Sequence, residues 1–230
     1  MLDPKDIAKR ITLALPGAVV EVRDLTGTGD HFEARVVAAA FEGMAMLDQH
    51  QARMRLLWEH SLRVAFYSFL LARDYKKRRD ILDDVYVAGI LHDLGFIAVT
   101  TLHPRTQEKM RKFSVQRNLP PRILERFSFG MNHADIGAMI AEKWRFPDQL
   151  IEGIKYHHDP LLARAAFKDV VFCVYLANAI CDVEREMISF RQLDRSVLAD
   201  FGIDSEERFA EIASRLKGSY DNRRSQLAVG

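Results

Sequence analysis

The chain has 230 residues, of which 48% are hydrophobic and 28% are charged, a composition typical of a globular protein with a sizeable core. Its formal net charge of +1 gives no overall electrostatic signal for nucleic acid or for a membrane surface. The first 50 residues carry 5 basic and 8 acidic side chains, so the remainder is net positive. This length suits one large domain or two small ones.

The two cysteines indicate a reducing compartment. Cys173 and Cys181 lie eight positions apart in one apolar segment, which is the wrong spacing for a disulfide within a helix, so we expect two buried thiols. The first ten residues lack the apolar stretch of a signal peptide, and no run reaches 18 apolar residues. These features predict a cytoplasmic protein without a transmembrane helix.

The beginning of the chain is predicted to form a short helix and two strands. Residues 3–15 have amphipathic helical spacing that stops at Pro16-Gly17. Apolar residues alternate loosely in AVVEVRDL (18–25) and in HFEARVVAAAF (31–41), and the intervening TGTGD is rich in Gly and Asp. This pattern predicts a β-hairpin.

Beyond residue 43 the hydrophobic spacing is helical, in segments of roughly 10–25 residues. The expected breaks are Gly95, Pro104, Pro120-Pro121, Gly130, Pro147, Pro160 and Gly202. We therefore predict a mainly α fold, with a small α+β segment over residues 1–52 and a helical bundle over residues 53–230.

Helix-end signals lie next to several polar residues. Asn132 can cap a helix that begins at His133. Pro147 suits the first turn of the following helix, and Pro160 is expected to close that helix just after His157-His158.

Polar side chains occupy the apolar faces of several predicted helices. His60, for example, shares a face with Val64, Tyr67 and Leu71. The same holds for His92, His133, His157, His158 and Asn178. Buried imidazoles need partners, and convergence with Asp93 on one pocket, around a shared metal, would satisfy them together. The alternative is a set of separate histidines, each hydrogen-bonded within the core.

Five segments carry a family resemblance: LWEHSLRVA (57–65), GILHDLG (89–95), NHADIGAMIAEKWRFP (132–147), IKYHHDP (154–160) and VYLANAIC (174–181). In this order they resemble the HD superfamily of metal-dependent phosphohydrolases and, more closely, its HDOD branch, the HD-related output domain of bacterial signalling proteins. The resemblance implies an HD-type helical bundle and a divalent metal site, for Fe, Mn, Zn or Mg, or a pocket without metal. The implied ligands are His60, His92, Asp93, His133, His157, His158 and Asn178.

Two positions depart from the catalytic members of the superfamily. Asn178 stands where those enzymes have a last Asp ligand, so Asp93 is the only carboxylate of the set. Phe96 stands where the related cyclic-di-GMP enzymes often have Lys, so a phosphate clamp is missing. Both departures are typical of HDOD domains, whose role is generally regulatory.

The N-terminal part resembles a second family. LPGAVVEVRDLTGTGDHFEARVVAAAFEG (15–43) and LDQHQ (47–51) are similar to BolA proteins, which pair with monothiol glutaredoxins around iron–sulfur clusters. His50 falls at the position of that family's ligand histidine, and His31 matches its second strand. The third strand and last helix of a BolA domain are absent, and the alternative is that His50 is a partly exposed helix residue without a ligand.

Basic residues gather between the HD and NH segments. Seven lie within residues 105–126: Arg105, Lys109, Arg111, Lys112, Arg117, Arg122 and Arg126. They are interpreted either as a solvated helix face or as a rim that attracts an anionic, nucleotide-like ligand.

Three functions follow from these patterns. The leading one is a regulatory signalling module of HDOD type that binds a protein partner or an anionic ligand through its His/Asp pocket. The second is an active metal-dependent phosphohydrolase on a nucleotide or cyclic dinucleotide, in which Asp93 would be catalytic. The third is an iron–sulfur-linked adaptor through the BolA-like segment.

Overall fold

The computed structural model describes Lys5 and residues 19–24, 32–37, 45–117, 119 and 121–228. Side chains are described between residues 54 and 226, apart from positions 104, 111, 115, 118 and 120. The chain divides into two compact units, Met1–Arg55 and Leu56–Gly230, each of which is treated by itself.

The first unit contains two strands. β1 (Val19–Asp24) and β2 (Phe32–Val37) pair antiparallel, with Val19 opposite Val37 and Asp24 opposite Phe32. Both strands are rich in valine, whose branched side chain favours extended backbone. The predicted turn TGTGD, the predicted helix over 3–15 and the side chains of His31 and His50 lie outside the described residues.

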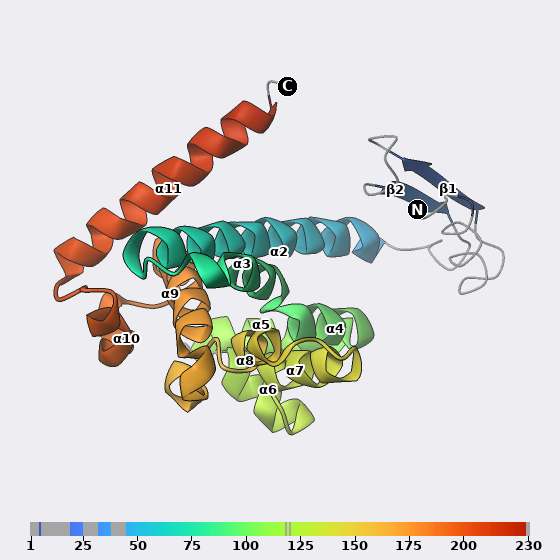
Figure 1. Cartoon of the computed structure of the whole chain (residues 1–230). Helices are drawn as coiled ribbons and strands as arrows, with labels where there is room; N and C mark the ends of the chain where they lie inside the picture. Colours follow the sequence, from blue (N-terminus) through green and yellow to red (C-terminus); the bar gives the residue numbers. More distant parts are fainter. Residues whose placement is uncertain are drawn as a thin grey trace. The chain divides into compact units, whose positions relative to one another are not determined.

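The second unit is helical, as the sequence predicts (Figure 1). Its helices are α2 (Ala45–Leu70, which begins in the first unit), α3 (Leu82–Leu91), α4 (Leu94–Leu102), α5 (Pro104–Arg117), α6 (Pro121–Phe129), α7 (His133–Lys143), α8 (Asp148–Lys155), α9 (Lys168–Glu184), α10 (Arg195–Asp200) and α11 (Glu206–Ala228). Shorter turns are the π-helical η2 (Leu71–Tyr75) and the 3-10 turns η3 (Arg79–Ile81), η4 (Pro160–Leu162), η5 (Ala165–Phe167) and η6 (Phe190–Gln192).

Helix α9 is the centre of this unit. From Val170 to Cys181 every residue except Tyr175 is buried, which is typical of a helix surrounded by other helices. Helices α3, α8 and α10 pack against it. Cys173 and Cys181 are buried free thiols, as predicted.

Helix α4 packs closely against α7 because glycines face each other where the two helices meet. A Cβ atom built on Gly95 would lie 1.9 Å from the backbone oxygen of His133 and 2.5 Å from the backbone nitrogen of Gly137. The sequence analysis predicts a helix break at Gly95. Instead, Gly95 lies inside α4 and permits backbone-to-backbone contact. The contact brings the start of α7 close to the start of α4.

The helix ends show which of the expected breaks hold. Pro104 and Pro121 open α5 and α6, and Asn132 caps α7 through a capping box with Asp135. Pro147 is the residue before α8 rather than part of its first turn. Helix α8 ends at Lys155, so the two histidines at 157 and 158 lie in the turn beyond the helix, not on its last turn.

One stretch, Arg79–Leu102, is long and apolar enough to cross a membrane by length and composition alone. It comprises η3, α3 and α4, and Val85, Ala88 and His92 within it are buried in the helical unit. Because buried core helices have the same composition, the stretch does not establish a membrane span.

The glycine contact between α4 and α7 makes a stability prediction. Gly95→Ala should destabilise the protein by about 3 kcal/mol, since one of the two backbones must move. Gly218→Ala on α11 is the matched control, because a Cβ there has no atom within 4 Å, and it should stabilise by roughly 0.5–1 kcal/mol. Urea unfolding of both variants measures the two effects, and equal stabilities would contradict the contact.

Candidate metal centre

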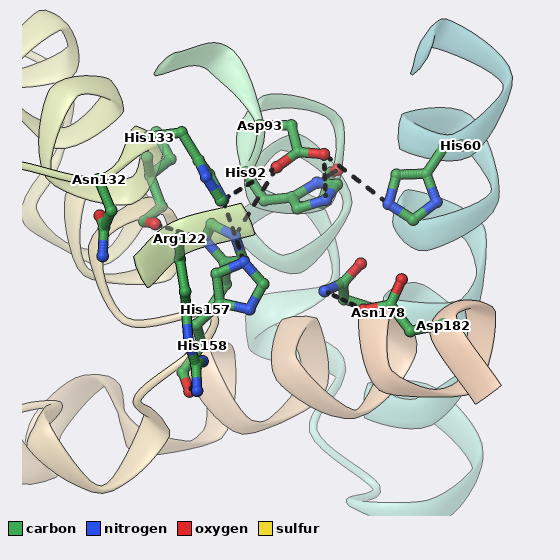
Figure 2. A network of polar contacts seen from close by, with 12 residues as sticks. His60, His92, Asp93, Arg122, Asn132, His133, His157, His158, Asn178 and Asp182 are labelled. Atoms are coloured by element: carbon green, nitrogen blue, oxygen red, sulfur yellow. Dashed lines mark hydrogen bonds and ion pairs between the residues drawn. The ribbon is translucent and has the colours of Figure 1, made fainter. Parts of the chain in front are cut away.

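The structure brings the seven predicted site residues together (Figure 2). They are contributed by α2 (His60), the junction of α3 and α4 (His92 and Asp93), the start of α7 (His133), the turn after α8 (His157 and His158) and α9 (Asn178). The HD pair thus ends one helix and begins the next, where both side chains face the other elements.

Asp93 lies between four imidazole rings. Its Oδ2 is 3.3 Å from the Nε2 atom of His92 and 3.8 Å from that of His60. Its Oδ1 is 3.6 Å from the Nε2 atom of His133 and 3.8 Å from that of His157. Each carboxylate oxygen therefore faces its own pair of histidines.

Backbone carbonyls fix the tautomers of the two most buried rings. The Nδ1 atom of His92 lies 2.7 Å from the oxygen of Gly89, and that of His157 lies 2.6 Å from the oxygen of Ile154. A carbonyl can only accept, so each Nδ1 carries the proton and donates it. In each neutral ring the Nε2 atom then carries a lone pair, which points toward Asp93.

This arrangement leaves acceptors facing acceptors. The Nε2 atoms of His92 and His157 are fully buried and have no hydrogen-bond partner among the described residues. The nearest charged group is the Asp93 carboxylate, which is also an acceptor. Lone pairs can face each other stably only with a cation between them, either a proton or a metal ion.

Glu125 positions the third ring. This fully buried carboxylate accepts from the Nδ1 atom of His133 at 2.6 Å and from its backbone nitrogen at 2.8 Å. The Nε2 atom of His133 then faces the Nε2 atom of His158 at 3.0 Å. A carboxylate behind a histidine is the usual support of a metal-ligating imidazole.

The donor atoms form two groups of three. His60, His92 and Asp93 are one group, and His133, His157 and His158 are the other, with all donor atoms of a group within 4.8 Å of one another. Neutral imidazoles with a carboxylate suit Fe, Mn or Zn. The residues present therefore fit a divalent metal, and Asp93 lies within 4 Å of members of both groups.

Burial and neighbouring charges shift the titration of these groups. Burial, together with the nearby His92, lowers the pKa of His60 to about 4. Burial opposes protonation of His92, but the attraction of Asp93 outweighs it and raises that pKa. The pKa of Asp93 is depressed well below its usual range, because the surrounding imidazoles outweigh the effect of its burial. Asp93 is therefore an anion at neutral pH.

The pKa of His133 is shifted in the opposite direction from those of His157 and His158. Burial lowers the pKa of both His157 and His158, and the neighbouring histidines add to this. For His133 the hydrogen bond to Glu125 outweighs burial and raises the pKa. The turn after α8 thus supplies neutral imidazoles, which is the form that binds a metal.

Asn178 lies on the His60 side of the cluster with a carboxylate one helical turn away (Figure 2). Its Nδ2 atom donates to Asp182 at 3.3 Å. Burial and the charge of Asp93 raise the pKa of Asp182 to about 6. A second carboxylate thus accompanies the amide.

Sequence reasoning missed the roles of Glu125 and Asp182. The spacing of Asp182, four residues after Asn178 on one helix, is a signal that could have revealed it. Glu125 gave no such signal, because α6 reaches α7 only through the turn at Gly130, whose φ of 77° lies in the left-handed region.

The basic residues between α5 and α6 divide by position. Those at 105, 109, 112, 117 and 126 are exposed, whereas Arg122 is partly buried and its Nη1 atom donates to the oxygen of His158 at 3.3 Å. Phe96, at the position of the expected phosphate clamp, places its ring edge-on to His133 with centroids 5.9 Å apart.

The fold and the site define a helical domain with a buried histidine–aspartate cluster, and comparison with known proteins gives the family. The HDOD domain family model matches residues 30–160, so the chain belongs to the HDOD family. The match includes residues 30–51 of the segment that resembles BolA, and the BolA resemblance itself stays a prediction.

One curated relative matches most of the chain. An uncharacterised protein of Treponema pallidum (strain Nichols) is 29% identical over 165 residues, which are 72% of this chain and 32% of that protein. The chain thus spans about a third of the curated relative's length.

Solved structures share the fold. An HDOD domain protein of unknown function from Geobacter sulfurreducens has a TM-score of 0.61 at 24% identity, covering 74% of this chain and 60% of that one. A proposed phosphohydrolase from Shewanella amazonensis has a TM-score of 0.53 at 21% identity, covering 77% of this chain and 61% of that one.

The titration of Asp182 can be measured in the metal-free protein. Its pKa is raised in the folded state, so it contributes stability below about pH 4 that is lost as the pH rises through about 6. Asp182→Asn should therefore stabilise the protein by roughly 2–3 kcal/mol at pH 7 and have little effect near pH 4. Urea unfolding in EDTA measures this, with the exposed Asp204→Asn as control. A stability difference that does not change with pH would contradict the assignment.

Proposed function

We propose that this chain is a regulatory HDOD module whose histidine–aspartate cluster binds a divalent metal ion and which acts by binding a partner or an anionic ligand. One observation supports metal binding: the buried Nε2 atoms of His92 and His157 face the Asp93 carboxylate without a hydrogen bond. A metal ion would neutralise this arrangement and connect elements from α2 to α8. Manganese, iron and zinc suit the imidazole-rich donor set better than magnesium does.

The regulatory role is supported by what the cluster lacks. Asn178 brings no charge where catalytic members of the superfamily bring a carboxylate, and Phe96 has an apolar ring where related enzymes have a cation that could hold phosphate. Metal binding with weak or absent catalysis makes the site a switch, because an ion that holds several helices together stabilises one arrangement of them.

Metal binding is the first test. The full chain, stripped with EDTA, should bind Mn²⁺, Fe²⁺ or Zn²⁺ and gain about 3 kcal/mol of stability at a metal concentration a hundred times Kd. Asp93→Asn keeps the side-chain volume but removes the charge, and should weaken metal binding by about tenfold to a hundredfold. The control is His103→Ala, at the exposed residue between α4 and α5. Equal metal affinity in the parent and Asp93→Asn proteins would contradict the proposal.

A second candidate is a metal-dependent phosphohydrolase acting on a nucleotide or cyclic dinucleotide. It is favoured by one observation: Asp93 belongs to one three-ligand group and also lies within 4 Å of a member of the other, as a ligand shared by two metal ions would. When bound, the metal would lower the pKa of a coordinated water to produce a nucleophile. Asp93 and Glu125 would hold the ligand set in place.

Asn178→Asp separates the two candidates. Without metal the new carboxylate would face Asp182, so the variant should be less stable than the parent. With Mn²⁺ or Fe²⁺ it should bind metal more tightly, and any phosphodiesterase activity on bis(p-nitrophenyl) phosphate should rise. A variant that is destabilised and gains nothing from metal would exclude a ligand role for position 178.

A further inference from the structure

Arg122 is a cation at the edge of the histidine cluster and has no acidic partner in the part of the chain that the structure describes. Among the described residues its side chain makes one hydrogen bond, from Nη1 to the carbonyl oxygen of His158 at 3.3 Å. A guanidinium has five N–H donors, so four of them remain available. Figure 2 shows Arg122 on the His158 side of the cluster, away from His60 and Asn178.

Other basic side chains nearby have different surroundings. Lys112 pairs with Glu108 at 3.7 Å, and Arg126 pairs with Asp135 at 3.7 Å. Both are exposed, whereas Arg122 is partly buried. Its hydrogen bond to the backbone of His158 places its charge next to the cluster.

The carboxylates of the cluster are directed at groups other than Arg122. Asp93 faces the imidazoles, and Glu125 accepts from His133. Asp182 accepts from Asn178, on the other side of the cluster from Arg122. The Arg122 guanidinium thus has no carboxylate against it among the described residues, and a guanidinium in this setting favours an anionic ligand.

We propose that Arg122 is an anion-binding residue of this site and that its ligand carries a phosphate group; this inference rests on the proposed metal binding. The buried Nε2 atom of His157 belongs to the same group of residues and also lacks a hydrogen-bond partner among the residues that the structure describes. The planar guanidinium matches the oxygens of phosphate in a two-pronged hydrogen bond. A tetrahedral phosphate can present other oxygens to a metal, whereas a carboxylate offers only two oxygens.

The test uses the full chain loaded with Mn²⁺ and inorganic phosphate as the probe. Paramagnetic broadening of the ³¹P signal reports phosphate near the bound ion, and equilibrium dialysis gives its affinity. Arg122→Gln should weaken phosphate binding about tenfold or more, as expected for the loss of charge-assisted hydrogen bonds. Its Mn²⁺ affinity should stay within about a factor of two, since Arg122 supplies no metal ligand.

Matched variants keep the test specific. Arg126→Gln removes the same charge one turn further along α6, from an exposed position, and should bind phosphate as the parent does. Arg122→Lys keeps the charge but loses the two-pronged geometry, so its affinity should be intermediate. This variant also serves if Arg122→Gln does not fold.

Each contrary result has a distinct meaning. A parent protein that binds no metal contradicts the proposed function and, with it, this inference. A parent that binds Mn²⁺ but no phosphate, or that binds acetate equally well, overturns the inference alone. Phosphate affinity that is unchanged in both Arg122 variants also overturns it.

Discussion

The Asp93 carboxylate is the constraint on which the rest of the site depends. It is a single anion among imidazole rings, and its two oxygens face different pairs of histidines. Because the rings of His92 and His157 are locked by backbone carbonyls, they cannot turn to offer an N–H instead. The helices that carry these rings therefore hold two lone pairs toward the Asp93 carboxylate, an arrangement that a cation beside Asp93 stabilises. The close packing of α4 against α7 at Gly95 sets the same geometry from the backbone side.

Helical periodicity explains why much of this could be predicted from the sequence. On α2 the spacing of His60 from Val64 and Tyr67 fixes the face that the ring shares with the core, whatever the rest of the chain does. The Asn132 cap is equally local, since its hydrogen bonds reach only three residues ahead. The family resemblance adds the order of the segments. The convergence of the predicted residues follows from these local rules and from the buried helix faces together.

Other features depend on contacts that no local pattern encodes. Glu125 reaches His133 only because the chain turns back after α6, and Arg122 reaches the cluster by the same path. The position of His157 beyond the end of α8 depends on where that helix stops, and a periodic pattern does not give a helix end to within two residues. Gly95 was expected to interrupt a helix, because its packing role requires knowledge of which backbone lies opposite.

The position of a bound ion is the most direct measure of this account. Crystals grown with Mn²⁺ can be measured at wavelengths above and below the manganese absorption edge, which locates the metal independently of the protein atoms. The account predicts an anomalous peak within coordinating distance of Asp93 and of the Nε2 atoms of His92 or His157. Manganese found only at other positions, with Asp93 hydrogen-bonded directly to protonated imidazoles, would contradict it.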